Sequence, residues 1–153
     1  MTSIEEHRIK ISEHLEEIDD AIKEGIDKKP ITIGFHCSAC SIQFLELYLH
    51  IANRISIGKI IKHDWFKKPH KEQKILPLIE RKLPVEFPRK EEIYNLIYEL
   101  EEDRNTLVYG KPAVEQVKKV FNTFLKLKEV FIGLLENEKF DIFQLLDSRG
   151  ESS

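Results

Sequence analysis

Apolar side chains recur every three or four residues along most of the chain, whereas strand-like alternation is nearly absent. This spacing matches the 3.6-residue period of an amphipathic helix. The first run begins at Ile4 and stops at Gly25, a residue type that is common just past a helix end. A second run covers residues 31–53 and includes small side chains that allow close helix packing, and Gly58 is expected to end it.

Prolines and glycines separate the remaining apolar runs. A structured connection follows Gly58, and Pro77 is expected to disturb a shorter helix in its middle. The helices predicted in this half span residues 71–82, 88–110 and 112–137, and a short amphipathic turn follows at 140–146.

These runs predict an all-α fold. We expect an antiparallel up-and-down helical bundle of four main helices plus short extra helices, because the links between the long runs are mostly short. The length suits one domain, over residues 1–147, and a flexible polar tail is expected at residues 148–153.

The composition is that of a globular protein. The 153 residues are 41% hydrophobic and 33% charged, and no apolar run approaches the roughly 20 residues that a membrane-spanning helix needs. The acidic N-terminus is unlike a signal peptide, so we expect a cytoplasmic protein with no membrane contact. Abundant lysine, glutamate and isoleucine are typical of a thermophilic source.

Charge is distributed unevenly along the chain. Residues 1–30 contain five basic and nine acidic side chains, a net charge of −4. Residues 54–90 contain eleven basic and four acidic side chains, a net charge of +7. The middle of the chain is therefore the natural place for an anionic partner.

Arg104 stands in line with apolar residues. Its helix places Ile93, Ile97, Leu100, Arg104 and Leu107 on one face, because they are separated by steps of four, three, four and three. An unpartnered guanidinium is costly to bury, so this position must meet a carboxylate, water, a partner subunit or an anionic ligand. Two interpretations stay open: a structural salt bridge to an acid on another helix, or a phosphate-binding arginine in a cleft.

The segment before Pro69 mixes cations with aromatic rings. Lysines that neutralise phosphates, beside rings that stack on bases, are typical of single-stranded nucleic-acid binding. The alternative buries Trp65 and Phe66 in the core and leaves the lysines in solvent. His63 beside Asp64 is either a local polar contact or a catalytic pair. Besides Arg104, the candidate nucleic-acid-binding residues are Asn105, Lys62, Trp65, Lys67, Lys68 and Lys111.

Cys37 and Cys40 form a Cys-x-x-Cys pair. Three interpretations compete: small side chains in a helix contact, a redox pair, or part of a zinc site. The six glycines are scattered, so the sequence has no Gly-rich phosphate loop, and neither Gly-x-Ser-x-Gly nor His-Glu-x-x-His occurs. No cofactor is predicted and no metal site is assigned.

Three segments resemble the HEPN superfamily of small helical bundles: HCSACSIQFLELYLH at 36–50, KHDW at 62–65 and RNTLVYG at 104–110. The resemblance implies a homodimer. In nuclease members an arginine, a polar residue and a following histidine cleave RNA without metal, in a cleft at the dimer interface. It therefore implies that Arg104 and Asn105 contact a phosphate. It also implies a small nucleotidyltransferase as a partner, as in toxin-antitoxin pairs.

Tyr109 stands where the family's histidine is expected. A phenol, with a reference pKa of about 10, is a poorer general base than imidazole, although it can donate a hydrogen bond to phosphate. On an ideal helix Tyr109 is rotated by about 140° from Arg104. The two are therefore not expected to share a pocket within one chain, unless the helix unwinds near Gly110 or a two-fold axis adds a second copy.

Three functional hypotheses follow. The first is a HEPN-like homodimer that binds RNA or nucleotide near Arg104 without efficient catalysis. The second is a metal-independent endoribonuclease in which Arg104 stabilises the phosphate and Tyr109 or His63 replaces the missing base. The third is a protein-interaction bundle in which an acid of the same chain fully engages Arg104.

Overall fold

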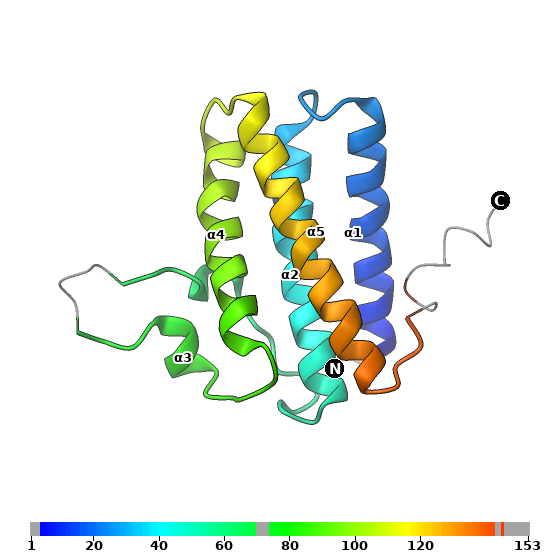
Figure 1. Ribbon diagram of the computed structural model, residues 1–153, viewed down its shortest axis with the longest axis vertical. Helices are drawn as coiled ribbons and strands as arrows, with labels where there is room; N and C mark the ends of the chain where they lie inside the picture. Colours follow the sequence, from blue (N-terminus) through cyan, green and yellow to red (C-terminus); the bar gives the residue numbers. More distant parts are fainter. Residues whose placement is uncertain (1–3, 70–73, 143–144, 146–153) are drawn as a thin grey trace.

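Four long helices form a bundle (Figure 1). The computed structural model describes residues 4–69, 74–142 and 145. The long helices are α1 (Ile4–Glu24), α2 (Pro30–Ile51), α4 (Lys90–Tyr109) and α5 (Val114–Asn137), and the short helices η1 (His63–Trp65) and α3 (Leu78–Lys82) lie between α2 and α4. Consecutive long helices run in opposite directions, and the described residues contain no strand. The predicted all-α bundle is therefore confirmed.

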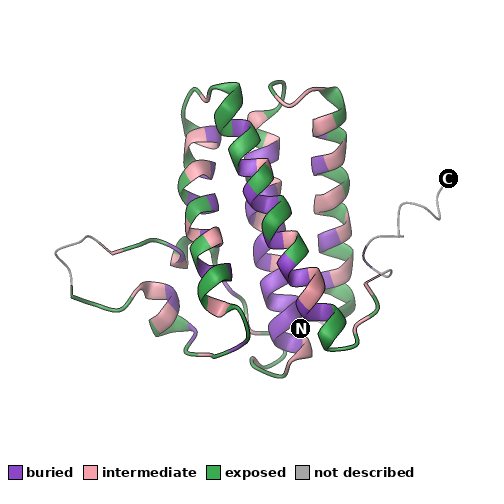
Figure 2. Ribbon diagram, viewed as in Figure 1, coloured by how far each residue is buried: buried purple, intermediate pink, exposed green. Residues whose placement is uncertain are grey.

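Helix α2 is the central element of the bundle. It packs against α1, α4 and α5, and fourteen of its 22 residues are buried (Figure 2). A helix that is apolar on nearly every side is what a central position requires. Its small residues allow α4 to come close, as predicted, because a Cβ atom added at Gly34 would lie 3.1 Å from the Cβ atom of Leu107.

Two predicted helix boundaries are wrong: the end of α2 and the start of α3. Helix α2 ends at Ile51, well before Gly58, and Asn53 then adopts the left-handed conformation with a φ of 57°. The helix predicted at 71–82 begins only at Leu78, because Pro77 is extended, with a ψ of 149°, and precedes the first turn. Residues 71–73 of that prediction lie outside the described residues.

The end of the chain is described only in part. Within the amphipathic turn predicted at 140–146, Leu145 is buried and its amide donates to the carbonyl oxygen of Ile142 at 2.9 Å. This contact fits the predicted turn. The tail predicted at residues 148–153 lies outside the described residues.

A buried polar cluster anchors the segment that leads from α2 to η1. His7 of α1 lies 2.8 Å from His50 Nδ1, and the Nε2 atom of His50 lies 3.0 Å from the carbonyl oxygen of Ser56. His7 Nδ1 also lies 2.9 Å from the side-chain oxygen of Gln43, so the two imidazoles belong to one buried hydrogen-bond chain. The amide N–H of Ile61 donates a hydrogen bond to Glu46 Oε1, with 2.8 Å between nitrogen and oxygen. These contacts fix the approach of the chain to His63.

Candidate functional site

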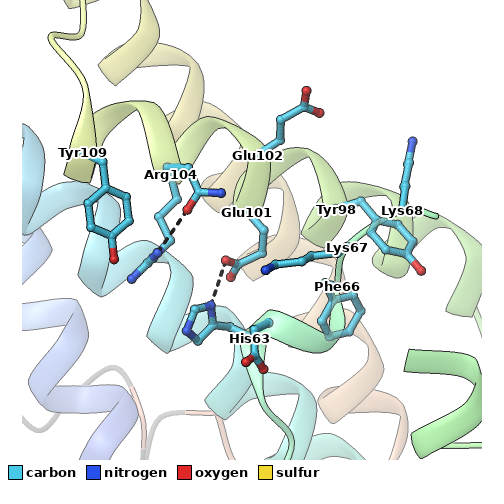
Figure 3. A pocket seen from close by; sticks show the side chains of 11 residues that line it. His63, Phe66, Lys67, Lys68, Tyr98, Glu101, Glu102, Arg104 and Tyr109 are labelled. Atoms are coloured by element: carbon cyan, nitrogen blue, oxygen red, sulfur yellow. Dashed lines mark hydrogen bonds and ion pairs between the residues drawn. The ribbon is translucent and has the colours of Figure 1, made fainter. Parts of the chain in front are cut away.

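A cavity of about 570 Å³ lies between α4 and the segment that begins at η1 (Figure 3). Helix α4 contributes Tyr98, Glu101, Glu102, Arg104, Asn105 and Tyr109 to its lining. The η1 segment contributes His63, Asp64, Phe66, Lys67 and Lys68.

A second stripe on α4 explains why this helix lines the cavity. Tyr98, Glu101, Asn105 and Tyr109 follow one another at steps of three or four residues, so they share one face. That face lies beside the apolar face that packs into the core. Arg104 belongs to the apolar face by its position, and its long side chain brings the guanidinium to the cavity.

The Arg104 side chain is buried without a full set of partners. It is only 9% exposed, and no described carboxylate forms an ion pair with it. Its Nη1 atom donates to Asn105 Oδ1 over 3.4 Å, which is long for a hydrogen bond, and its buried Nε atom has no partner among the described residues. The guanidinium can therefore bind an anion that enters the cavity.

Tyr109 lines the same cavity as Arg104, so the expectation that the two cannot share a pocket within one chain is wrong. Tyr109 is 79% exposed at the last residue of α4, and Figure 3 shows its ring beside the guanidinium. The ideal-helix angle describes where the Cα–Cβ bonds point. A long arginine side chain can bend toward a neighbouring face, which the angle does not capture.

His63 pairs with Glu101 of α4 rather than with its neighbour Asp64. The Nδ1 atom of His63 lies 3.1 Å from Glu101 Oε2, and the Glu101 side chain is 8% exposed. The hydroxyl of Ser38, on α2, donates to the other carboxylate oxygen of Glu101. One buried carboxylate thus connects α2, α4 and η1.

The two aromatic rings of the basic segment do not stand free in the cavity. Phe66 is 2% exposed and packs edge-on against Tyr94 and Tyr98. Trp65 is half-buried against the core, with Lys59 Nζ 5.8 Å from its ring centroid. The interpretation that buries these rings in the core holds for Phe66, whereas Trp65 packs against the core and stays half-buried.

The structure brings six of the predicted site residues to one cavity: Arg104, Asn105, Tyr109, His63, Lys67 and Lys68. It does not bring Lys62, Trp65 or Lys111 there. Tyr98, Glu101 and Glu102 were not predicted. Tyr98 and Glu101 belong to the second stripe on α4, at the same spacing as the apolar one but one face away, and this stripe is the signal that would have found them.

Cys37 and Cys40 are free and fully buried in the core. Burial raises the pKa of both thiols, which disfavours the thiolate that redox chemistry and zinc binding require. In the described part of the chain, no three His, Cys, Asp or Glu side chains converge to hold a metal ion. These findings support the helix-packing interpretation of the two cysteines.

Comparisons with known proteins give no match for this chain among protein-family models, curated proteins or solved structures. The HEPN resemblance therefore rests on three sequence segments, and function has to be inferred from the cavity itself. Among the described residues, no helix combines the length and apolar character that crossing a membrane requires.

Proposed function

We propose that the cavity binds the phosphate of single-stranded RNA or of a nucleotide, with Arg104 and Asn105 at the phosphate. The observation that carries this proposal is the state of Arg104: buried, without an ion pair to a described carboxylate, and with an unpartnered Nε atom. A buried guanidinium destabilises a protein unless an anion compensates it. Its planar fork of N–H donors matches two phosphate oxygens.

The surroundings of Arg104 support an anionic ligand. Lys67 and Lys68 are exposed at the cavity, where they can meet neighbouring phosphates. Of the carboxylates that line it, Glu101 is engaged by Ser38 and His63. The other two, Asp64 and Glu102, are exposed to solvent, so the buried charge without an opposite partner is positive.

Affinity for single-stranded RNA tests this proposal. Fluorescence anisotropy with a labelled oligonucleotide at low salt should show binding, and Arg104→Ala should weaken it about tenfold or more, the size of a charge-assisted hydrogen bond. Arg89→Ala is the matched control, because Arg89 lies at the other end of α4 and already pairs with Glu92 at 2.8 Å. Equal affinity of the Arg104 variant and the parent would refute the proposal.

Cleavage of RNA is the second candidate function, because His63 and Tyr109 line the same cavity as Arg104. Under single-turnover conditions with a chelator, this candidate predicts cleavage that Arg104→Ala abolishes. Arg89→Ala again serves as the control. Intact RNA after long incubation at high protein concentration would leave binding as the function.

The third hypothesis, a protein-interaction bundle, required an acid of the same chain to engage Arg104 fully. No described carboxylate does so, which favours the two ligand-binding hypotheses. The cytoplasmic location, the thermophilic source and the nucleotidyltransferase partner stay predictions of the sequence.

The homodimer also stays a proposal, with one supporting observation. Ile31 and Phe35 are 58% and 49% exposed on α2, close to the point where Gly34 meets the end of α4 that carries Tyr109. Exposed apolar side chains of this kind are common at interfaces between subunits. Sedimentation analysis should give the mass of two chains, and the mass of one chain would contradict the proposal.

A further inference from the structure

Glu101 holds His63 in one orientation. The carboxylate of Glu101 is buried between α2 and α4, and it accepts the Ser38 hydroxyl on Oε1. Its other oxygen lies 3.1 Å from His63 Nδ1. His63 itself is 47% exposed, so a buried and fully occupied carboxylate orients an accessible imidazole.

The hydrogen bonds determine which nitrogen of His63 carries the proton. An ionised carboxylate only accepts hydrogen bonds, so the nitrogen that faces Glu101 must be Nδ1–H. In the neutral ring the other nitrogen, Nε2, is then unprotonated and accepts hydrogen bonds. Figure 3 shows the ring edge opposite Glu101 turned toward the side of the cavity where Arg104 and Tyr109 lie.

The unprotonated Nε2 atom of His63 favours a ligand that carries a hydrogen-bond donor. Phosphate oxygens accept hydrogen bonds, which suits Arg104, Lys67 and Lys68 but not an unprotonated imidazole nitrogen. A ligand that fills the cavity therefore needs an O–H or N–H group close to its phosphate. In a nucleotide chain, a sugar hydroxyl next to the phosphodiester meets this requirement.

We propose that Glu101 is a positioning residue that presents His63 Nε2 as the acceptor for a ligand hydroxyl beside the phosphate bound by Arg104. This inference rests on the proposed phosphate binding and adds a preference to it. The cavity distinguishes ligands that carry a hydroxyl at that place from otherwise identical ligands that lack it. Arg104 provides affinity for both, and the Glu101 and His63 pair provides the difference between them.

The position of the proton on the neutral His63 ring tests whether Glu101 presents Nε2 as an acceptor in the unaltered protein. Nitrogen-15 NMR, at a pH where His63 is neutral, should show a protonated Nδ1 and an unprotonated Nε2. Glu101→Leu removes the acceptor and should shift His63 toward a mixture of the two forms. A parent protein with the proton on Nε2 would overturn the inference.

The ratio of two affinities tests the second step. The probes are oligouridylate and oligodeoxyuridylate of equal length, which differ in the sugar hydroxyl alone. The parent should prefer the ribose form about fivefold, the net worth of one hydrogen bond. His63→Phe and Glu101→Leu should reduce this ratio to about one, and Glu99→Leu, on the same helix, should leave it unchanged. His63 is exposed enough for its variant to fold even where Glu101→Leu does not.

The outcomes separate this inference from the proposed function. If Arg104→Ala weakens both probes equally but the parent does not prefer ribose, phosphate binding stands and the role of Glu101 is refuted. A fivefold preference that persists in His63→Phe also refutes it. If Arg104→Ala weakens neither probe, phosphate binding fails and this inference fails with it.

Discussion

At the scale of single residues, Arg104 combines a cost in fold stability with a place in the candidate binding site. The guanidinium lies on the apolar face of α4, and its Nε atom has no hydrogen-bond partner among the described residues. A side chain selected for stability alone would be apolar at this position. A residue that lowers stability where it lines a cavity is typical of a binding site.

Replacing Arg104 by methionine should therefore stabilise the fold while it abolishes ligand binding. Methionine fills similar space without a buried charge, and we expect the free energy of unfolding to rise by about 1–2 kcal/mol, the usual cost of an unsatisfied buried polar group. Chemical denaturation of the ligand-free protein measures the change. A less stable variant would show that the guanidinium has a structural partner.

His14 and His36 form a second residue-scale feature. Their Nδ1 atoms lie 2.9 Å apart, so one ring donates and the other accepts. Burial, and then the charge of His36, lower the pKa of His14 from 6.5 to about 4. Burial also lowers the pKa of His36.

Acid should therefore weaken the fold through this pair. The unfolded chain takes up a proton at His14 as the pH falls through 6.5, whereas the folded protein resists it until about pH 4. The free energy of unfolding should decrease as the pH falls between these values, because the unfolded state binds more protons. In the His14→Gln variant the free energy of unfolding should decrease less steeply as the pH falls, which denaturation at a series of matched pH values measures. Identical slopes would contradict this assignment.

At the scale of elements, the contact between α2 and α4 decides where the cavity lies. Gly34 lets α4 approach α2, and Ser38, one turn further on, reaches Glu101. Leu107 is fully buried at this contact, so it has little room to move. The position of the cavity therefore depends on a glycine outside its lining.

Alanine at two helical glycines should have opposite effects. Gly34→Ala places a methyl group 3.1 Å from Leu107 Cβ, and we expect a loss of about 1–2 kcal/mol, because overpacking outweighs the gain in helix propensity. The methyl group of Gly133→Ala has no atom within 4 Å, and this variant should gain about 0.5–1 kcal/mol in the free energy of unfolding. Thermal and chemical denaturation compare the two, and a stabilised Gly34→Ala would contradict the close contact.

Helical periodicity was enough to predict the four long helices. Each buries a continuous apolar face, so the pattern in the sequence directly records the packing. The apolar pattern places the start of α3 too early, because Pro77 is the boundary of this helix and not a disturbance inside it. Gly58 does not mark the end of α2, because the helix stops at Ile51 and Asn53 then adopts the left-handed conformation.

The candidate site was predictable only where a residue broke a pattern or belonged to a local motif. Arg104 interrupts an apolar face, so sequence reasoning found it. Glu101 is one of several acids in the same stretch, and its contacts with Ser38 and His63 join residues far apart in the sequence. Such a tertiary contact leaves no local signal. Tyr109 was predicted from a motif, but its place beside Arg104 depends on side-chain length.

At the scale of the whole molecule, the basic middle of the chain should govern the salt dependence of binding. Lys67 and Lys68 are exposed beside the cavity. Each lysine that contacts a phosphate adds about 0.7 to the slope of log affinity against log salt for a single strand. Lys67→Gln and Lys68→Gln should each reduce the slope by about this amount. Lys118→Gln, on α5 and paired with Glu115, should not change it.

The central claim is that an anion enters the cavity and meets Arg104, and the Nε–H resonance of Arg104 reports this most directly. In proton–nitrogen NMR spectra, titration with a mononucleotide should shift this resonance saturably while that of Arg89 stays in place. The shift should occur because a phosphate bound at the guanidinium changes the surroundings of the Nε atom, which has no partner in the described chain. A nucleotide that leaves the Arg104 resonance unmoved throughout the titration would contradict the account.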